Sequence, residues 1–310
     1  MNELIRPPYL KAGDTVAIVA PAGVLQSDTP IPEAKKLLES WGLHVKVGPN
    51  VFSDGKHFAG NDRERASDFQ SALDDNSVKA IWAARGGYGT VRIIDMLDFS
   101  KFRKSPKWIA GYSDITVLHS HMHIMGYETI HSVMGGEMDR DSVGVQKSIS
   151  ALKNAIFGKE LNYEIAPSEY NRLGTAKGQV VGGNLSILQS LLGSTSQIET
   201  KNKILFIEEI GEYKYAIDRM FYALKRAGYF EQCNGLIVGG MTKVKKNTTP
   251  YGMTVEELIL NVVKDYDFPI LFDFPAGHGD VNEAILMGRE VELIVEKDNV
   301  ELHYLNGGTQ

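Results

Sequence analysis

A regular alternation of short apolar runs with longer amphipathic patterns is the feature that most constrains how the first half of this chain can fold. The run from Val16 to Ala20 is rich in β-branched residues and stops at Pro21-Ala22-Gly23, which predicts a strand followed by a turn. Further strands are predicted at 44–47, 78–83 and 108–111, and helices at 33–41, 62–73 and 115–124. Strands that alternate with helices in this way predict parallel βαβ units in a doubly wound α/β sheet.

The character of the sequence changes near Tyr163 to Lys177, a polar stretch that contains Pro167 and Gly174. We interpret this stretch as a linker, and we expect two domains, at 1–165 and 175–310, because 310 residues exceed the usual size of one domain. The second half is more β-rich: strands are predicted at 204–207, 236–238 and 270–272, helices at 185–192 and 215–226, and a hairpin at 291–295 and 300–304.

Composition excludes several classes of protein. The formal net charge is −6, and the single basic cluster, Lys243 to Lys246, is typical of a solvated loop, so we expect no nucleic-acid partner. Cys233 is the one cysteine, which excludes an intrachain disulfide and a thiolate metal site and suits a reducing compartment. Because the sequence has neither a secretory signal at its start nor eighteen consecutive apolar residues, we expect a cytoplasmic protein that does not enter a membrane.

Three polar or glycine-rich loops follow predicted strands directly, at 21–23, 85–89 and 111–114. In open α/β sheets, ligands bind outside the carboxyl ends of the strands. We therefore expect these loops to lie on one rim and to form part of a binding site.

Ser113 is the candidate nucleophile on this rim, in the segment Gly111-Tyr112-Ser113-Asp114. A sharp turn from strand to helix can expose a serine hydroxyl and direct amide N–H groups at an oxyanion. Ile115 occupies the position of the last glycine in the G-x-S-x-G pattern, so the generic elbow is broken. A helix N-cap is the structural alternative for this serine.

The loop Arg85-Gly86-Gly87-Tyr88-Gly89 allows a ligand to approach the main chain closely. It could donate N–H groups to an oxyanion or cradle a phosphate, although it has no P-loop lysine. A plain tight turn is the remaining interpretation.

Histidine could supply the general base. Of His119, His121 and His123, only the first and the last share a helix face. We interpret the three as packing and surface residues rather than as a metal site. His278 differs because it lies between Gly277 and Gly279 in a loop that follows the strand predicted at 270–272, which favours exposure in a cleft.

A carboxylate could orient that histidine. The apolar run 204–207 ends in Glu208 and Glu209, whose side chains alternate to opposite faces of a strand, so spacing does not choose between them. A surface pair is the structural alternative. The chain order Ser…Glu…His is one that α/β-hydrolases also use.

Several segments together resemble the serine LD-carboxypeptidases, also called muramoyltetrapeptide carboxypeptidases. The similarity covers nearly the whole chain and is carried by segments at 7–21, 58–66, 84–89, 111–114, 182–185, 206–209 and 274–278. It implies a Ser113, Glu208 and His278 triad, with oxyanion donation by the main-chain N–H groups of Gly87 and Asp114.

The resemblance also implies a fold, a Rossmann-like or flavodoxin-like amino-terminal domain with a smaller β-rich, swivelling β/α carboxy-terminal domain, usually in a homodimer. The expected reaction releases terminal D-alanine from a muropeptide tetrapeptide in cell-wall recycling, without a metal or organic cofactor. One alternative is an amidase of the same fold that acts on peptide-nucleotide antibiotics and confers immunity. The alternative from a different class is a non-catalytic module that binds a nucleotide or flavin on the glycine-rich rim.

Overall fold

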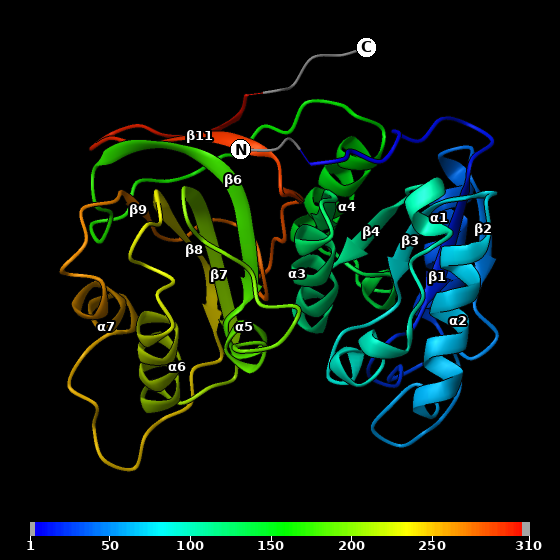
Figure 1. The fold of residues 1–310 in the computed structure, drawn as a ribbon, viewed down its shortest axis with the longest axis horizontal. Helices are drawn as coiled ribbons and strands as arrows, with labels where there is room; N and C mark the ends of the chain where they lie inside the picture. Colours follow the sequence, from blue (N-terminus) through cyan, green and yellow to red (C-terminus); the bar gives the residue numbers. More distant parts are fainter. Residues whose placement is uncertain (1–3, 306–310) are drawn as a thin grey trace.

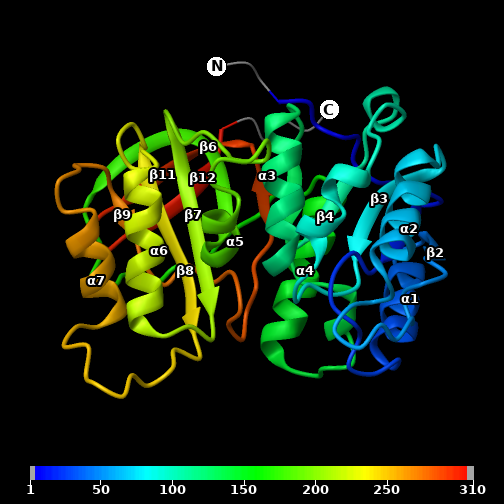
Figure 2. The same cartoon turned by 60° about the horizontal axis from the view of Figure 1, so that its bottom comes forward.

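The computed structural model describes residues 4–305, which form two six-stranded sheets side by side (Figures 1 and 2). The strand order of the first sheet is β10-β5-β4-β3-β1-β2 and that of the second is β12-β11-β6-β7-β8-β9. In the first half the elements are β1 (Thr15–Val19), α1 (Pro30–Ser40), β2 (His44–Val47), α2 (Asp62–Asp74), β3 (Val78–Ala83), β4 (Trp108–Gly111), α3 (Thr116–Ile124), β5 (Thr129–His131) and α4 (Val143–Ile156).

The first sheet is covered by helices on both faces, as its sequence pattern predicts. Val16 and Ile18 of β1 pack with residues of α1 and α4, whereas Ala17 and Val19 pack with residues of α2 and α3. Alternate residues of one strand therefore enter two separate cores, which explains why the run is apolar throughout. The prediction of a doubly wound α/β unit is confirmed.

The second sheet contains β6 (Gly174–Asn184), β7 (Lys203–Ile210), β8 (Gly235–Thr242), β9 (Ile270–Leu271), β11 (Glu290–Val295) and β12 (Val300–Tyr304). The four strands from β6 to β9 are parallel, and β11 and β12 form the predicted antiparallel hairpin. Three helices cover one face of this sheet: α5 (Leu185–Ser190), α6 (Lys214–Arg226) and α7 (Val255–Val262).

The first sheet is not wholly parallel, because a strand from the second half of the chain enters it. Strand β10 (Ile285–Met287) pairs antiparallel with β5, in the register Ile285 with His131. The chain thus crosses from the first sheet to the second and returns once. The division into domains at 1–165 and 175–310 stays a prediction, and the returning strand shows that the two sheets are joined by more than a linker.

No helix within the described part of the chain is long and apolar enough to cross a membrane.

Candidate active site

The turn that carries Ser113 follows β4 directly and is held in a strained conformation. Ser113 has a φ of +62°, in the left-handed region that non-glycine residues seldom adopt, and it begins a short 3₁₀ turn, Ser113–Ile115, that leads into α3. The Ser113 hydroxyl has no hydrogen-bond partner among residues 4–305, so it does not cap the helix. Such a turn leaves the hydroxyl free for a ligand.

Ile115 explains why the turn does not follow the glycine pattern of the generic elbow. Its side chain is fully buried, and a Cβ on Gly111 would come within 2.9 Å of its Cγ1. The close approach that glycine allows in this turn is therefore made at Gly111, before the serine, with the isoleucine packed against it.

The glycine-rich loop packs directly on Ser113. A Cβ on Gly86 would lie 3.0 Å from the Ser113 Cβ and 3.2 Å from its Oγ, and Gly87 has a φ of +95°. The loop is fixed in turn to the loop after β1, since the N–H of Gly23 donates to the carbonyl of Gly86 at 2.8 Å. Of the three rim loops, those at 21–23 and 85–89 are thus bound together against the serine turn.

Asp114 ties the same loop to the serine turn through its side chain. The carboxyl is fully buried, and its Oδ2 accepts the main-chain N–H of Thr90 at 2.7 Å. Burial raises the pKa of Asp114. The buried guanidinium of Arg65, on α2, donates to the carbonyls of Gly89 and Pro21 at 2.9 and 2.5 Å. Neither anchor could be identified from the sequence, because each depends on a contact between distant segments.

His278 and Glu208 form a close pair. The His278 Nδ1 lies 2.6 Å from the Oε2 of Glu208, and the Glu208 side chain is fully buried. Gly277 has a φ of +103°, and a Cβ there would lie 2.7 Å from the Cβ of Glu208, so glycine is required before the histidine. Burial alone lowers the pKa of His278, but the hydrogen bond and charge of Glu208, with the charges of Glu209 and Glu137, raise it above its usual 6.5.

The neighbouring acid, Glu209, faces away from the histidine. Its Oε2 accepts the N–H and the hydroxyl of Ser186 at 2.8 and 2.6 Å, and its Oε1 accepts the N–H of Ile210 at 2.7 Å. Burial raises the pKa of Glu209. Geometry therefore distinguishes the two acids, which spacing in the sequence could not do.

A cavity of about 610 Å³ brings Ser113 and His278 together. Gly86 and Gly87 also line it, whereas Glu208 lies buried behind the histidine. Its charged lining residues are Arg85, Glu137, Asp139, Arg140 and Lys243. Groups from both sheets thus meet at the carboxyl ends of β3, β4, β7 and β8, where open α/β sheets bind ligands.

Tyr112 completes the wall beside the histidine, a role that the sequence did not indicate. The centroid of its ring lies 4.8 Å from the centroid of the His278 ring, and its hydroxyl donates to Oε1 of Glu137 at 3.1 Å. An aromatic residue next to a candidate nucleophile is the only signal that could have found it.

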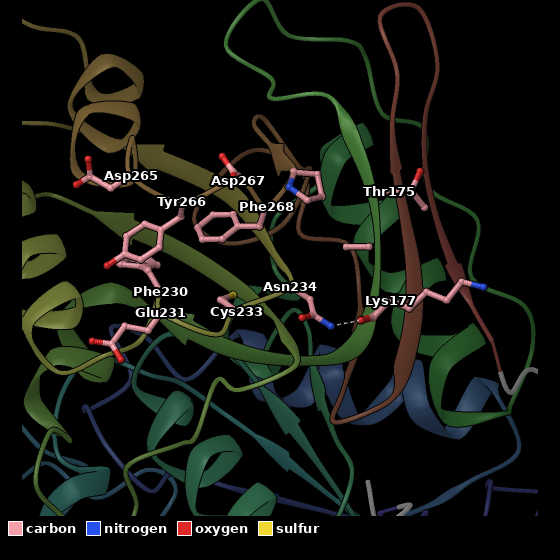
Figure 3. Close-up of a pocket in the computed structure, with 12 residues that line it drawn as sticks. Thr175, Lys177, Phe230, Glu231, Cys233, Asn234, Asp265, Tyr266, Asp267 and Phe268 are labelled. Atoms are coloured by element: carbon pink, nitrogen blue, oxygen red, sulfur yellow. Dashed lines mark hydrogen bonds between the residues drawn. The ribbon is translucent and has the colours of Figure 1, made fainter.

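A second hollow, of about 630 Å³, lies at the opposite end of the second sheet (Figure 3). It is lined by the residues that precede or begin the strands, such as Thr175, Asn234 and Phe268, with Tyr266 and Phe268 side by side. It holds neither a histidine nor a serine. The candidate serine and histidine lie at the other end of the sheet.

The histidine trio on α3 is not a metal centre. His119 is buried, with its ring nitrogens 2.8 Å from the Thr129 hydroxyl and 2.9 Å from the Gly111 carbonyl. Burial lowers the pKa of His119 to about 4, so this ring is neutral and structural. No group of three His, Cys, Asp or Glu side chains within residues 4–305 could hold a metal ion.

Replacing Gly86 with alanine should obstruct this site without unfolding the chain. The φ of Gly86 is not in the left-handed region, so alanine fits the backbone, but its methyl group would press on Ser113 at 3.0 Å. We expect turnover to fall about tenfold or more, since small misplacements of a reacting group have large effects on rate. Steady-state kinetics on Gly86→Ala, with the melting temperature as a check, would measure this. Gly235→Ala, whose new Cβ would meet side chains at 3.4 Å or more, is the control.

Comparison with known proteins identifies similar sequences. The family described as LD-carboxypeptidase N-terminal domain matches residues 16–132, and LD-carboxypeptidase C-terminal domain matches residues 177–293. The "Probable murein peptide carboxypeptidase" of Bacillus subtilis (strain 168) is 35% identical over 298 residues, which cover 93% of this chain and 91% of that protein. The "Murein tetrapeptide carboxypeptidase" of Pseudomonas aeruginosa is 25% identical over 90% of this chain and 92% of its own.

Solved structures share the fold. The muramoyltetrapeptide carboxypeptidase from Oxalobacter formigenes has a TM-score of 0.83 and 26% identity, over 94% of this chain and 98% of that one. The structure of MccF in complex with glutamyl sulfamoyl guanosine has a TM-score of 0.87 at 18% identity, over 99% of this chain and 100% of that one. At that identity the likeness concerns the fold alone.

Proposed function

Because the chain belongs to the LD-carboxypeptidase family, a family of peptidases, we propose that it is a serine carboxypeptidase that hydrolyses an L,D-amide bond. Its substrate is a muropeptide tetrapeptide, from which it releases the terminal D-alanine during cell-wall recycling. The observation that carries this proposal is the pairing of His278 with the buried Glu208 on the wall of the cavity that also contains Ser113.

In the proposed mechanism, Oγ of Ser113 attacks the carbonyl carbon of the L-residue, and Nε2 of His278 takes the hydroxyl proton. Glu208 accepts the Nδ1–H of His278, which sets the tautomer and stabilises the imidazolium. The imidazolium then protonates the nitrogen of D-alanine, the amide bond breaks, and an acyl-enzyme on Ser113 remains. Water, deprotonated by His278, hydrolyses that ester and restores the serine.

The main-chain N–H groups of Gly87 and Asp114 are the proposed oxyanion donors. Gly86 packs on Ser113, and the Asp114 carboxyl holds Thr90, so the glycine-rich loop and the serine turn are fixed relative to each other before substrate binds. Donors that need no rearrangement stabilise a developing negative charge most effectively. The cationic side chains of Arg140 and Lys243 on the cavity wall suit a substrate that ends in a carboxylate.

The rate should depend on pH through His278. A general base acts in its neutral form, and the pKa of His278 is raised above 6.5 by Glu208 and the acids around it. We expect kcat/KM to rise with pH along a limb whose midpoint lies above 6.5. A pH–rate profile from pH 5 to 9 would measure it; a midpoint below 6 would contradict this assignment of the base.

The substrate is tested by incubation of the protein with matched tetrapeptides that differ only in the configuration of the last residue. We expect release of D-alanine from the L,D-linked peptide and no release of L-alanine from the L,L-linked peptide. Mass spectrometry would measure both products. Equal cleavage of both, or of neither, would reject an L,D-specific carboxypeptidase. The heat-denatured protein is the control.

A second candidate function is hydrolysis of an amide in a peptide-nucleotide antibiotic, which the likeness of the fold to MccF favours. An aminoacyl sulfamoyl nucleoside added as a further substrate in the same assay separates the two. The non-catalytic nucleotide-binding module would be favoured by a Ser113 far from His278, but the two line one cavity.

We further propose a cytoplasmic homodimer whose partner is the small peptide substrate, with no nucleic acid or membrane. Light scattering coupled to size exclusion would give twice the mass of 34.3 kDa if the dimer forms.

A further inference from the structure

We propose that Asn184 is a positioning residue that ties the helix behind the nucleophile to the acid and base supplied by the second half of the chain. The inference rests on the triad of the proposed function, and it names a residue that does not touch the reacting atoms. Asn184 is the last residue of β6 and is 5% exposed. Its main chain faces the first half of the chain, and its side chain faces the acids.

The main-chain contact of Asn184 reaches the serine turn. Its N–H donates to the Oγ1 of Thr116 at 3.0 Å, and Thr116 begins α3 three positions after Ser113. The two segments approach so closely that a Cβ on Gly183 would lie 2.4 Å from the Thr116 Oγ1, and Gly183 has a φ of +136°. Glycine is required there, which fits a contact between two sheets rather than a loose surface.

The side chain of Asn184 reaches both buried acids. Its Nδ2 donates to Oε1 of Glu208 at 3.2 Å and to Oε1 of Glu209 at 3.1 Å, while its Oδ1 accepts the N–H of Ile187 and caps α5. One carboxylate oxygen of Glu208 is thus hydrogen-bonded to Asn184 and the other to His278. The carboxylate cannot rotate without losing one of the two, so Asn184 determines how Glu208 presents itself to the histidine.

A second contact joins the serine turn to the base, on the other side of Ser113. Tyr112, the residue before Ser113, packs its ring 4.8 Å from the ring of His278. Residues on both sides of Ser113 thus contact the base or its support, Tyr112 directly and Thr116 through Asn184 and Glu208. The alignment of nucleophile and base is therefore fixed by two points rather than by the linker between the sheets.

The variant Asn184→Asp separates this role from the helix cap. Aspartate keeps an oxygen for the Ile187 N–H, but as a carboxylate it cannot donate to Glu208. We expect kcat to fall about 10- to 100-fold with KM within about twofold, because the geometry of the base is disturbed while the substrate cavity is not. Asn234→Asp is the matched control, since within residues 4–305 the Asn234 side-chain amide donates only to the Lys177 carbonyl, at the far end of the sheet.

The same variant should shift the pH–rate profile. Glu208 contacts His278 directly, and the charges of Glu209 and Glu137 also act on it. The other charged groups on the cavity wall are Arg85, Asp139, Arg140 and Lys243. A further negative charge at position 184 raises the pKa of His278, so the acid limb moves to higher pH. Because this shift follows from the added charge itself, the positioning role is judged from kcat and from Thr116→Val, which adds no charge.

Thr116→Val tests the contact between the two halves without a change in charge. Valine keeps the shape of threonine but removes the acceptor for the Asn184 N–H, and we expect kcat to fall about tenfold with the midpoint of the acid limb unmoved. Thr200→Val is matched to it, because it also removes a buried hydroxyl, one that donates to the Tyr229 carbonyl.

A measurement that needs no substrate tests the positioning role of Asn184 independently of the proposed activity. The low-field proton signal of His278 Nδ1–H, assigned by its loss in His278→Gln, should shift or broaden in Asn184→Asp and Thr116→Val but not in the two controls. An unchanged signal and kcat in Asn184→Asp would overturn the role of Asn184. Failure to release D-alanine with the signal altered as expected would instead reject the substrate and leave the positioning role supported.

Discussion

Replacing Ser113 with alanine is expected to lower kcat by about 10⁴-fold or more while the fold is retained. The hydroxyl is the only group in the proposed mechanism that forms a bond to the substrate. It makes no hydrogen bond within residues 4–305, so its removal leaves no buried partner without a contact. Rates of D-alanine release from the L,D-linked tetrapeptide would measure the effect.

The stability of Ser113→Ala shows whether a loss of activity comes from the missing hydroxyl or from a damaged fold. Alanine adopts a φ of +62° no more easily than serine does, so we expect the free energy of unfolding to change by less than about 1 kcal/mol. Ser132→Ala, which removes a buried hydroxyl that donates to the Val133 carbonyl, is a control with a comparable change. Full activity in Ser113→Ala would reject the serine mechanism.

Much of the first half of the fold could be predicted because strands such as β1 and β4 are buried along their whole length and carry apolar runs, while β2, at the edge of the sheet, shows an alternating pattern. The short strand β5 and the helix α4 are not indicated by the sequence. Strand β10 could not be predicted either, because it has three residues and pairs with a strand far away in the chain. Its presence in the first sheet is decided by the packing of Ile285 and Met287 against Phe206 and Phe274, which no local pattern reports. Short strands are the elements whose formation depends most on tertiary contacts.

The candidate site also has features that follow from the sequence and features that only the structure shows. The rim position of Ser113 follows from the strand that precedes it, and the exposure of His278 follows from the glycines beside it. The contacts that hold them, from Asp114 to Thr90 and from Thr116 to Asn184, join segments that are distant in sequence or belong to different sheets. Such pairs leave no periodic signal, so only the structure finds them.

The choice between the two acids shows the limit most clearly. Alternation along β7 placed Glu208 and Glu209 on opposite faces but could not say which face holds the histidine. In the structure, Phe206 packs with Phe274 on the face that His278 reaches, whereas Leu205 and Ile207 pack with α5 and α6. Glu208 lies on the His278 side and Glu209 lies against α5, at Ser186. The decision therefore rests on which helices cover which face.

Exchanging each acid for its amide is the second experiment with a large expected effect. Glu208→Gln should lower kcat by about 10³- to 10⁴-fold, because an amide can donate to Nδ1 and so favour the wrong tautomer of His278. The volume is almost unchanged, and Asn184 can still donate to the amide oxygen. A loss of this size would thus report the charge and the tautomer rather than a cavity.

Glu209→Gln is the matched variant at the adjacent position. Its carboxylate accepts hydrogen bonds from Ser186 and Ile210 rather than from His278, so we expect kcat to fall no more than about tenfold. Removal of its negative charge should also lower the pKa of His278 slightly and move the acid limb of the profile to lower pH. Both variants are measured side by side on the same peptide, with melting temperatures. An equal loss in the two would leave the assignment of Glu208 as the acid unsupported, because a group that only shapes the field around the histidine cannot act as strongly as its hydrogen-bond partner.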